Sequence, residues 1–235
     1  MGNGESRDRS RLEVVWYRLV QASITTFLTA LDGVRATGRH NIPESGPVLL
    51  VSNHASFLDV LVLGILLRRP LNYVARSTLF FPPLGAFIRS VGGFPIQREG
   101  MGASGLKETL RRLRNGGIVV LFPEGTRSRD GELQPIKAGI AVLAQRAKVP
   151  IVPAGVAGTF EAWPRTSPIP LLHPIRVHYG PPITPEQIAG LAPETITALI
   201  RERMLDCLHE ARRGLARDLG RDRQEIAVGQ NDKLG

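Results

Sequence analysis

A histidine and an aspartate five residues apart could form a catalytic pair. The run N-H-A-S-F-L-D, residues 53–59, follows an apolar stretch, residues 47–52, that is typical of a buried strand. Ligands of open α/β sheets bind at the C-terminal ends of strands. On one continuous helix the side chains of His54 and Asp59 would point about 140° apart. They meet only if the helix begins after His54, and the carboxylate would then orient an imidazole that acts as a general base.

The same spacing also has a purely structural interpretation. Ser56 is a good residue to cap the N-terminus of the helix, Asp59 could complete a capping box with it, and His54 could bind a loop carbonyl. An isolated motif of this kind favours that interpretation. If the pair is catalytic, the absence of a G-x-S-x-G sequence leaves the substrate's own hydroxyl as the nucleophile.

A second polar run, F-P-E-G-T-R-S at residues 122–128, directly follows another apolar stretch, residues 117–122. Donors from Thr126, Arg127 and Ser128 in a turn that contains glycine would suit a phosphate group. Glu124 could orient Arg127 or accept a hydrogen bond from a substrate hydroxyl. Taken alone, the run could also be an ordinary turn that carries a surface arginine.

Other possible sites are weaker. Gly100, Gly102 and Gly105 spell G-x-G-x-x-G, but the preceding strand contains Pro95 and ends in two charged residues, which does not suit a dinucleotide fingerprint. Cys207 lies within a helical pattern, away from any glycine-rich turn, and is interpreted as an inert, half-buried thiol. We therefore expect no bound cofactor, and no His/Cys cluster has the spacing of metal ligands.

The elements that must position these residues alternate along the chain. Continuous apolar strands that alternate with helices predict an α/β fold: a single domain with a largely parallel, mixed sheet covered by helices. Strands are expected at residues 47–52, 71–75, 94–97, 117–122, 149–156 and 175–179, and helices at 57–67, 79–90, 105–115, 138–147 and 195–213.

The ends of the chain differ from this central pattern. Residues 1–10 are expected to be disordered, residues 11–34 to form an amphipathic helical element, residues 35–211 to be the domain that carries both motifs, and residues 212–235 to be a basic flexible tail. The apolar face of the helical element could pack on the domain or lie in a membrane interface. No segment is apolar enough to span a bilayer, because residues 14–31 include Arg18 and Gln21.

Composition and charge limit the possible partners. The 235 residues are 43% hydrophobic and carry a net charge of +9, with a pI of about 10.7. These values fit one globular domain that binds an anion. Residues 60–115 hold nine Lys/Arg against two acids, so most of the excess lies between the two motifs. Aromatic residues are only 6%, without a recognisable nucleic-acid motif, which disfavours stacking on bases.

Together, the two runs resemble the glycerolipid acyltransferase family that includes the 1-acylglycerol-3-phosphate acyltransferases. The runs G-G-F-P-I-Q-R at residues 92–98 and V-P-I-V-P at residues 149–153 are similar to two further blocks of that family, in the same order. The match covers residues 38–156. Two departures could shift acceptor preference: R-S-T-L at residues 76–79 replaces a common K-x-E-L, and Gln97 stands where aspartate is common.

The resemblance implies roles for individual residues. It assigns the catalytic base to His54 and its orientation to Asp59. It assigns the acceptor's phosphate and glycerol to a set of residues from the second and third blocks: Arg98, Glu124, Gly125, Thr126 and Arg127.

The resemblance also implies an activity. A fatty acyl group would pass from acyl-CoA or acyl carrier protein to the hydroxyl of 1-acylglycerol 3-phosphate, forming phosphatidate at an anionic membrane surface. We expect the protein on the cytoplasmic side of the cell membrane, peripheral or monotopic. Alternatives are an acyltransferase for another lysophospholipid, glycerol 3-phosphate or an aminolipid, and, more distantly, a non-enzymatic basic protein that binds membranes or nucleic acid.

Overall fold

The computed structural model describes residues 11–30, 33–96 and 102–220, and in them seven strands form one sheet. Its order is β1-β7-β6-β2-β5-β3-β4. The five strands from β6 to β4 are parallel, β7 is antiparallel to β6, and β1 is parallel to β7. The strands are β1 (Val34–Thr37), β2 (Val48–Ser52), β3 (Leu71–Arg76), β4 (Gly93–Ile96), β5 (Ile118–Leu121), β6 (Ile151–Ala157) and β7 (Ile175–Tyr179). The predicted α/β fold with a largely parallel, mixed sheet is confirmed.

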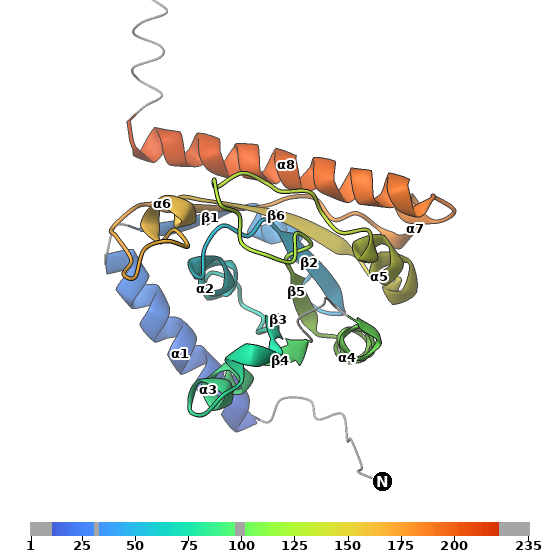
Figure 1. Cartoon of the computed structure of the whole chain (residues 1–235), viewed down its shortest axis with the longest axis horizontal. Helices are drawn as coiled ribbons and strands as arrows, with labels where there is room; N and C mark the ends of the chain where they lie inside the picture. Colours follow the sequence, from blue (N-terminus) through green and yellow to red (C-terminus); the bar gives the residue numbers. More distant parts are fainter. Residues whose placement is uncertain (1–10, 31–32, 97–101, 221–235) are drawn as a thin grey trace, which may run out of the picture.

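Helices cover both faces of this sheet (Figure 1). They are α1 (Arg11–Ala30), α2 (Leu58–Ile65), α3 (Leu84–Ser90), α4 (Gly102–Arg114), α5 (Gly139–Ala147), α6 (Thr159–Ala162), α7 (Pro185–Ile188) and α8 (Pro193–Asp218). Single 3₁₀ turns, η1 (Arg39–Asn41) and η2 (Ser77–Leu79), follow β1 and β3.

The central strand β2 shows why its sequence is apolar throughout. Successive side chains of a strand point to opposite faces. Leu49 and Val51 pack in a cluster with α4, α5 and α8, whereas Val48 and Leu50 pack in a second cluster with α2. All four side chains have no exposed surface. Because both faces of the sheet are covered, this strand lacks the polar alternation of a half-exposed one.

Some short elements were not predicted. Strand β1 was missed because it has only four residues and just one of them, Val34, is buried. The single-turn helices α6 and α7 were missed as well. Helix α8 continues to Asp218, beyond the expected domain boundary at residue 212, because Leu215 is buried and Asp218 pairs with Arg35 and Arg176. The expected disorder of residues 1–10 lies outside the described residues.

Helix α8 also holds the single cysteine. Cys207 is 3% exposed, and its Sγ lies 3.6 Å from the carbonyl oxygen of Pro153 in β6. Burial raises the pKa of the Cys207 thiol to about 12, so little thiolate forms at neutral pH. This agrees with the interpretation of Cys207 as an inert thiol, although the side chain is fully buried and not half-buried as expected.

Helix α1 packs on the domain through polar side chains. The Tyr17 hydroxyl accepts a hydrogen bond from the backbone N–H of Leu71 (3.2 Å), and Gln21 Nε2 donates to the carbonyls of Gly64 and Leu67 (2.7 Å each). Trp16 Nε1 donates to Ser90 Oγ of α3 (3.0 Å). One side of α1 thus packs on the domain, while other apolar side chains of the same helix stay exposed. Among the described helices, none combines the length and apolar character that crossing a bilayer requires.

We predict that Gly155→Ala destabilises the protein. Gly155 lies in β6 directly beneath α8, and a Cβ there would come within 2.3 Å of Cys207 C and Leu208 N. Because these are backbone atoms, the helix would have to shift, which should lower the free energy of unfolding in a urea titration by about 1–3 kcal/mol. The control is Gly139→Ala, since nothing lies within 4 Å of that position. Equal stability of both variants would contradict this account of the α8–β6 contact.

Candidate active site

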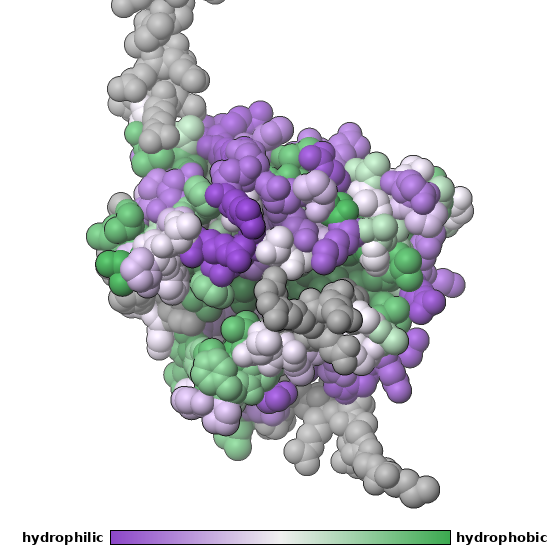
Figure 2. All heavy atoms as spheres, viewed as in Figure 1, coloured by the Kyte–Doolittle hydropathy of each residue, from purple (hydrophilic) through white to green (hydrophobic). Residues whose placement is uncertain are grey.

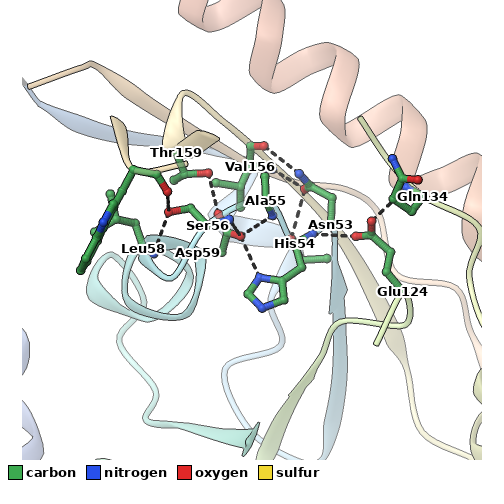
Figure 3. A network of polar contacts seen from close by, with 12 residues as sticks. Asn53, His54, Ala55, Ser56, Leu58, Asp59, Glu124, Gln134, Val156 and Thr159 are labelled. Atoms are coloured by element: carbon green, nitrogen blue, oxygen red, sulfur yellow. Dashed lines mark hydrogen bonds and ion pairs between the residues drawn. The ribbon is translucent and has the colours of Figure 1, made fainter. Parts of the chain in front are cut away.

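The histidine and aspartate of the first motif are in contact (Figure 3). His54 lies in the turn after β2, and Asp59 is the second residue of α2. The distance from His54 Nδ1 to Asp59 Oδ2 is 2.9 Å. Asp59 has no exposed surface, whereas the His54 side chain is 17% exposed. The helix begins after the histidine, as the orienting geometry required, so the buried carboxylate holds one ring nitrogen while the ring edge remains accessible.

The structural interpretation is only partly correct: the N-cap of α2 is Phe57, without a side-chain cap, and not Ser56, but Asp59 does bind the turn before the helix. Asp59 Oδ2 accepts hydrogen bonds from the backbone N–H groups of Ala55 and Ser56, both at 2.7 Å. Ser56 Oγ accepts a weaker one from the N–H of Leu58 (3.2 Å). One carboxylate therefore closes the turn before α2 and orients the imidazole, and the two interpretations of the spacing are not exclusive.

The second motif is joined to the backbone of His54. Glu124 is only 4% exposed; its Oε1 accepts from the His54 N–H (2.7 Å) and its Oε2 from the Gln134 N–H (2.9 Å). The Ser128 N–H donates to the His54 carbonyl (2.7 Å). The turn at residues 122–128 is thus fixed to both the N–H and the carbonyl of His54, so the two motifs form one unit.

Burial raises the pKa of the Glu124 carboxyl to about 7, against the opposing effect of the two backbone N–H donors. Sequence reasoning assigned this residue to Arg127 or to a substrate hydroxyl. In the structure its carboxylate accepts hydrogen bonds from the backbone N–H groups of His54 and Gln134, so Glu124 holds the turn in place.

The rest of the turn presents cationic and small groups. Gly125 has φ +70°, a conformation that favours glycine, and a Cβ there would lie 2.7 Å from Lys137 Nζ. Thr126 is exposed. The guanidinium of Arg127 lies 3.6 Å from the centre of the Phe57 ring, which fixes its position by a cation–π contact. Lys137 was not predicted, because it lies nine residues after the motif in a segment without a pattern of its own.

One residue predicted to bind the phosphate lies outside the described part of the chain. Arg98, assigned to the acceptor's phosphate, falls in residues 97–101, outside the described residues, and its role stays a prediction. Gln97 lies in the same segment.

Three further residues, which had no predicted role, support the pair. The Phe122 ring stacks on the His54 ring, with centroids 4.0 Å apart and planes 19° apart. The Asn53 side chain exchanges two hydrogen bonds with the backbone of Val156 in β6 (2.8 and 2.9 Å). Thr159 Oγ1 donates to Asp59 Oδ1 (2.5 Å). Phe122 and Asn53 belong to the motifs themselves, but the contact of Thr159 spans 100 residues and leaves no local signal.

An apolar cavity of about 240 Å³ adjoins this site. Side chains from α1, α2, α3 and β3 line it, including Tyr17, Val60, Tyr73 and Phe87. Phe57 lines it as well and carries Arg127 on its ring, so the cavity and the cationic turn share one wall. Across the described part of the chain, no three His, Cys, Asp or Glu side chains are grouped closely enough to hold a metal ion.

The fold and site together define an α/β protein with an oriented imidazole, joined through its backbone to a cationic turn that shares Phe57 with an apolar cavity. A protein-family model described as Acyltransferase matches residues 33–157. A 1-acyl-sn-glycerol-3-phosphate acyltransferase of Bacillus subtilis is 32% identical over 144 residues, which cover 60% of this chain and 71% of that protein. The chain therefore belongs to the acyltransferase family and is an enzyme of that class, which confirms the resemblance seen in the sequence.

Longer relatives extend the comparison. The human 1-acyl-sn-glycerol-3-phosphate acyltransferase alpha is 32% identical over 184 residues, 75% of this chain and 64% of that protein. A chloroplastic enzyme of the same name from Brassica napus is 35% identical, but this chain covers only 39% of its length. The crystal structure of the 1-acyl-sn-glycerophosphate (LPA) acyltransferase PlsC from Thermotoga maritima matches with a TM-score of 0.71 at 24% identity, covering 88% of this chain and 83% of that one. At that identity the match supports the fold.

We predict a distinctive pH dependence for Glu124→Gln. A carboxyl whose pKa is raised on folding favours the folded state most below its ordinary value of 4.5, and that contribution is lost as the pH rises through about 7. The wild-type free energy of unfolding, minus that of the variant, should therefore fall between pH 4.5 and 7 by at most about 1.4 kcal/mol per pH unit, and then level off.

Urea titrations at several pH values measure this difference. Glu202→Gln on the exposed side of α8 is the control, and its difference from the wild type should not change in this way. A Glu124 difference that rises with pH would mean that the two backbone donors outweigh burial.

Proposed function

We propose that the protein transfers a fatty acyl group from a thioester donor to the free hydroxyl of 1-acylglycerol 3-phosphate, forming phosphatidate. The observation that carries the proposal is the His54–Asp59 pair, which is joined to a cationic turn that shares Phe57 with an apolar cavity. These three features match the three parts of such a reaction: a hydroxyl to deprotonate, a phosphate and an acyl chain. The names of the relatives from Bacillus subtilis and human support the acceptor.

The geometry supports direct transfer with one general base. Because Nδ1 of His54 faces the Asp59 carboxylate, Nε2 is the nitrogen that takes the proton of the acceptor hydroxyl. The hydroxyl oxygen attacks the thioester carbonyl, the C–S bond breaks, and the thiolate receives the proton from His54. A thiol with a pKa near 8.5 is a good leaving group, so the base helps mainly the weak nucleophile. Asp59 stabilises the imidazolium formed in between.

The remaining groups hold the acceptor. Arg127 and Lys137 supply positive charge beside the Gly125 turn, and the Thr126 hydroxyl can donate to the same phosphate. Arg98 would add a further cation. Glu124 contributes by fixing the turn against the backbone of His54, which sets the distance from the phosphate to the base. The acyl chain of the thioester would occupy the apolar cavity, with Phe57 between the chain and the phosphate.

We predict that His54→Ala loses transfer activity but keeps the fold. Removal of a positioned base typically costs about 10²–10⁴-fold. The assay measures transfer from acyl-CoA and from acyl carrier protein to 1-acylglycerol 3-phosphate, to other lysophospholipids, to glycerol 3-phosphate and to an aminolipid. His209→Ala, on an exposed position of α8, is the control and should keep wild-type activity.

A folded His54→Ala variant with near-wild-type rates would contradict the proposed base. If the wild type prefers one of the other acceptors, the proposed acyl transfer stands but 1-acylglycerol 3-phosphate is not its acceptor.

We also propose that the protein works against an anionic membrane, on the cytoplasmic side of the cell membrane, as a peripheral or monotopic protein. Figure 2 shows hydrophobic side chains over α3 and over the loop that follows α6. Large apolar side chains are exposed on α1, around α3 and in that loop: Leu12, Val15, Trp16, Leu19, Phe81, Leu84, Phe87, Ile169, Leu171 and Leu172. The loop, residues 163–174, contains Arg165 and no acid. Apolar groups with neighbouring cations suit an anionic lipid surface.

We predict that the double variant Leu171→Glu/Leu172→Glu binds anionic vesicles about tenfold more weakly or worse. These side chains are 61% and 66% exposed, so the change should not disturb the core, but it removes apolar area and adds repulsion. Co-sedimentation with vesicles measures the binding at low and high salt. Val142→Glu on α5 is the control, because Val142 is an exposed apolar side chain on another element.

Transfer to an acceptor dispersed in detergent should stay unchanged in the double variant. Unaltered vesicle binding would exclude the loop from the membrane contact.

A further inference from the structure

Thr159 contacts the carboxylate oxygen of the buried Asp59 that does not face His54. It is the first residue of α6, has no exposed surface, and its Oγ1 donates to Asp59 Oδ1 at 2.5 Å. The other oxygen, Oδ2, is engaged by His54 Nδ1 and by the N–H groups of Ala55 and Ser56. Each carboxylate oxygen thus has its own donors, and a rotation of the carboxylate would break the contact with Thr159 (Figure 3).

The position of Thr159 is itself fixed by its neighbours. Gly158 has φ +90°, and a Cβ there would lie 2.1 Å from the carbonyl oxygen of Pro174, so the chain turns tightly just before the threonine. The Thr159 carbonyl accepts from the N–H of Trp163 (2.9 Å). Farther back, Val156 exchanges two hydrogen bonds with the Asn53 side chain. Asn53 therefore joins the end of β2 to the end of β6, which sets the distance between His54 and Thr159.

We propose that Thr159 is a positioning residue for the base, acting through Asp59, and this rests on the proposed function of His54. The hydroxyl keeps Oδ1 turned toward α6 and so leaves Oδ2 toward the imidazole. Because the donor is neutral, it satisfies the buried oxygen without cancelling the negative charge that stabilises the imidazolium. A lysine or arginine at the same place would satisfy the oxygen but remove that charge.

The test compares Thr159→Val with Thr159→Ser. Valine has the shape of threonine but lacks the donor, so the carboxylate can rotate and kcat/KM should fall by about 10- to 100-fold. A rotated carboxylate stabilises the imidazolium less, so the acid limb of the kcat/KM profile should move to lower pH. Serine restores the hydroxyl and should restore both the rate and the limb.

Thr109→Val is the matched control. Thr109 is as buried as Thr159 but lies in α4, and within the described residues its Oγ1 has no hydrogen-bond partner. This variant should keep the wild-type rate and pH profile. The other ionisable side chains around the His54 turn, Glu124 and Arg127, are unchanged in all three variants, so a shifted limb reports on Thr159.

A readout independent of turnover separates this proposal from the function itself. The NMR signals of the His54 ring should titrate at a lower pH in Thr159→Val than in the wild type, even if no acyl acceptor is turned over. Absence of transfer by the wild type would contradict the proposed function alone. An unshifted ring titration in a folded Thr159→Val variant, or a serine variant that behaves like valine, would overturn the role of Thr159.

Discussion

The carboxylate of Asp59 is the charge around which the site is built. A buried carboxylate is costly unless hydrogen-bond donors surround it. Here the donors come from the turn after β2, which includes His54, and from α6, so satisfying one charge brings two distant segments of the chain together. The parallel sheet makes this possible because β2 and β6 are neighbours whose C-terminal ends lie at the same edge. The accessible imidazole is then a consequence of this burial.

Much of the fold was predictable because it depends on local composition. Continuous apolar runs such as β2 and β5 are typical of strands covered on both faces, and their alternation with helices indicates a parallel sheet. Strand β1 was not predictable, since its four residues V-R-A-T contain a single buried side chain and owe their strand conformation to pairing with β7. Likewise, the extent of α8 depends on ion pairs between Asp218 and two distant arginines.

The site was predictable only within each motif. The spacing of His54 and Asp59 predicted their contact, because five residues and a helix start determine it. The burial of Glu124 was not predictable, since a glutamate in a turn is usually exposed. The sequence also overstated the surface charge of residues 60–115. Arg69 donates to the carbonyls of Pro43, Gly46 and Gly116, and Arg111 and Arg112 both pair with Glu108, so part of the excess serves the domain itself.

The attachment of the second motif to the backbone of His54 has a consequence for how this enzyme can diverge. The contacts from Glu124 and Ser128 end on the N–H and the carbonyl of His54 itself, so the distance between the reacting imidazole and the cationic turn is fixed. Residues of the turn cannot move to fit a longer or shorter headgroup without displacing the base. A change of substrate must then come from exchanging side chains around Thr126 and Lys137, while the distance from the turn to the imidazole stays constant.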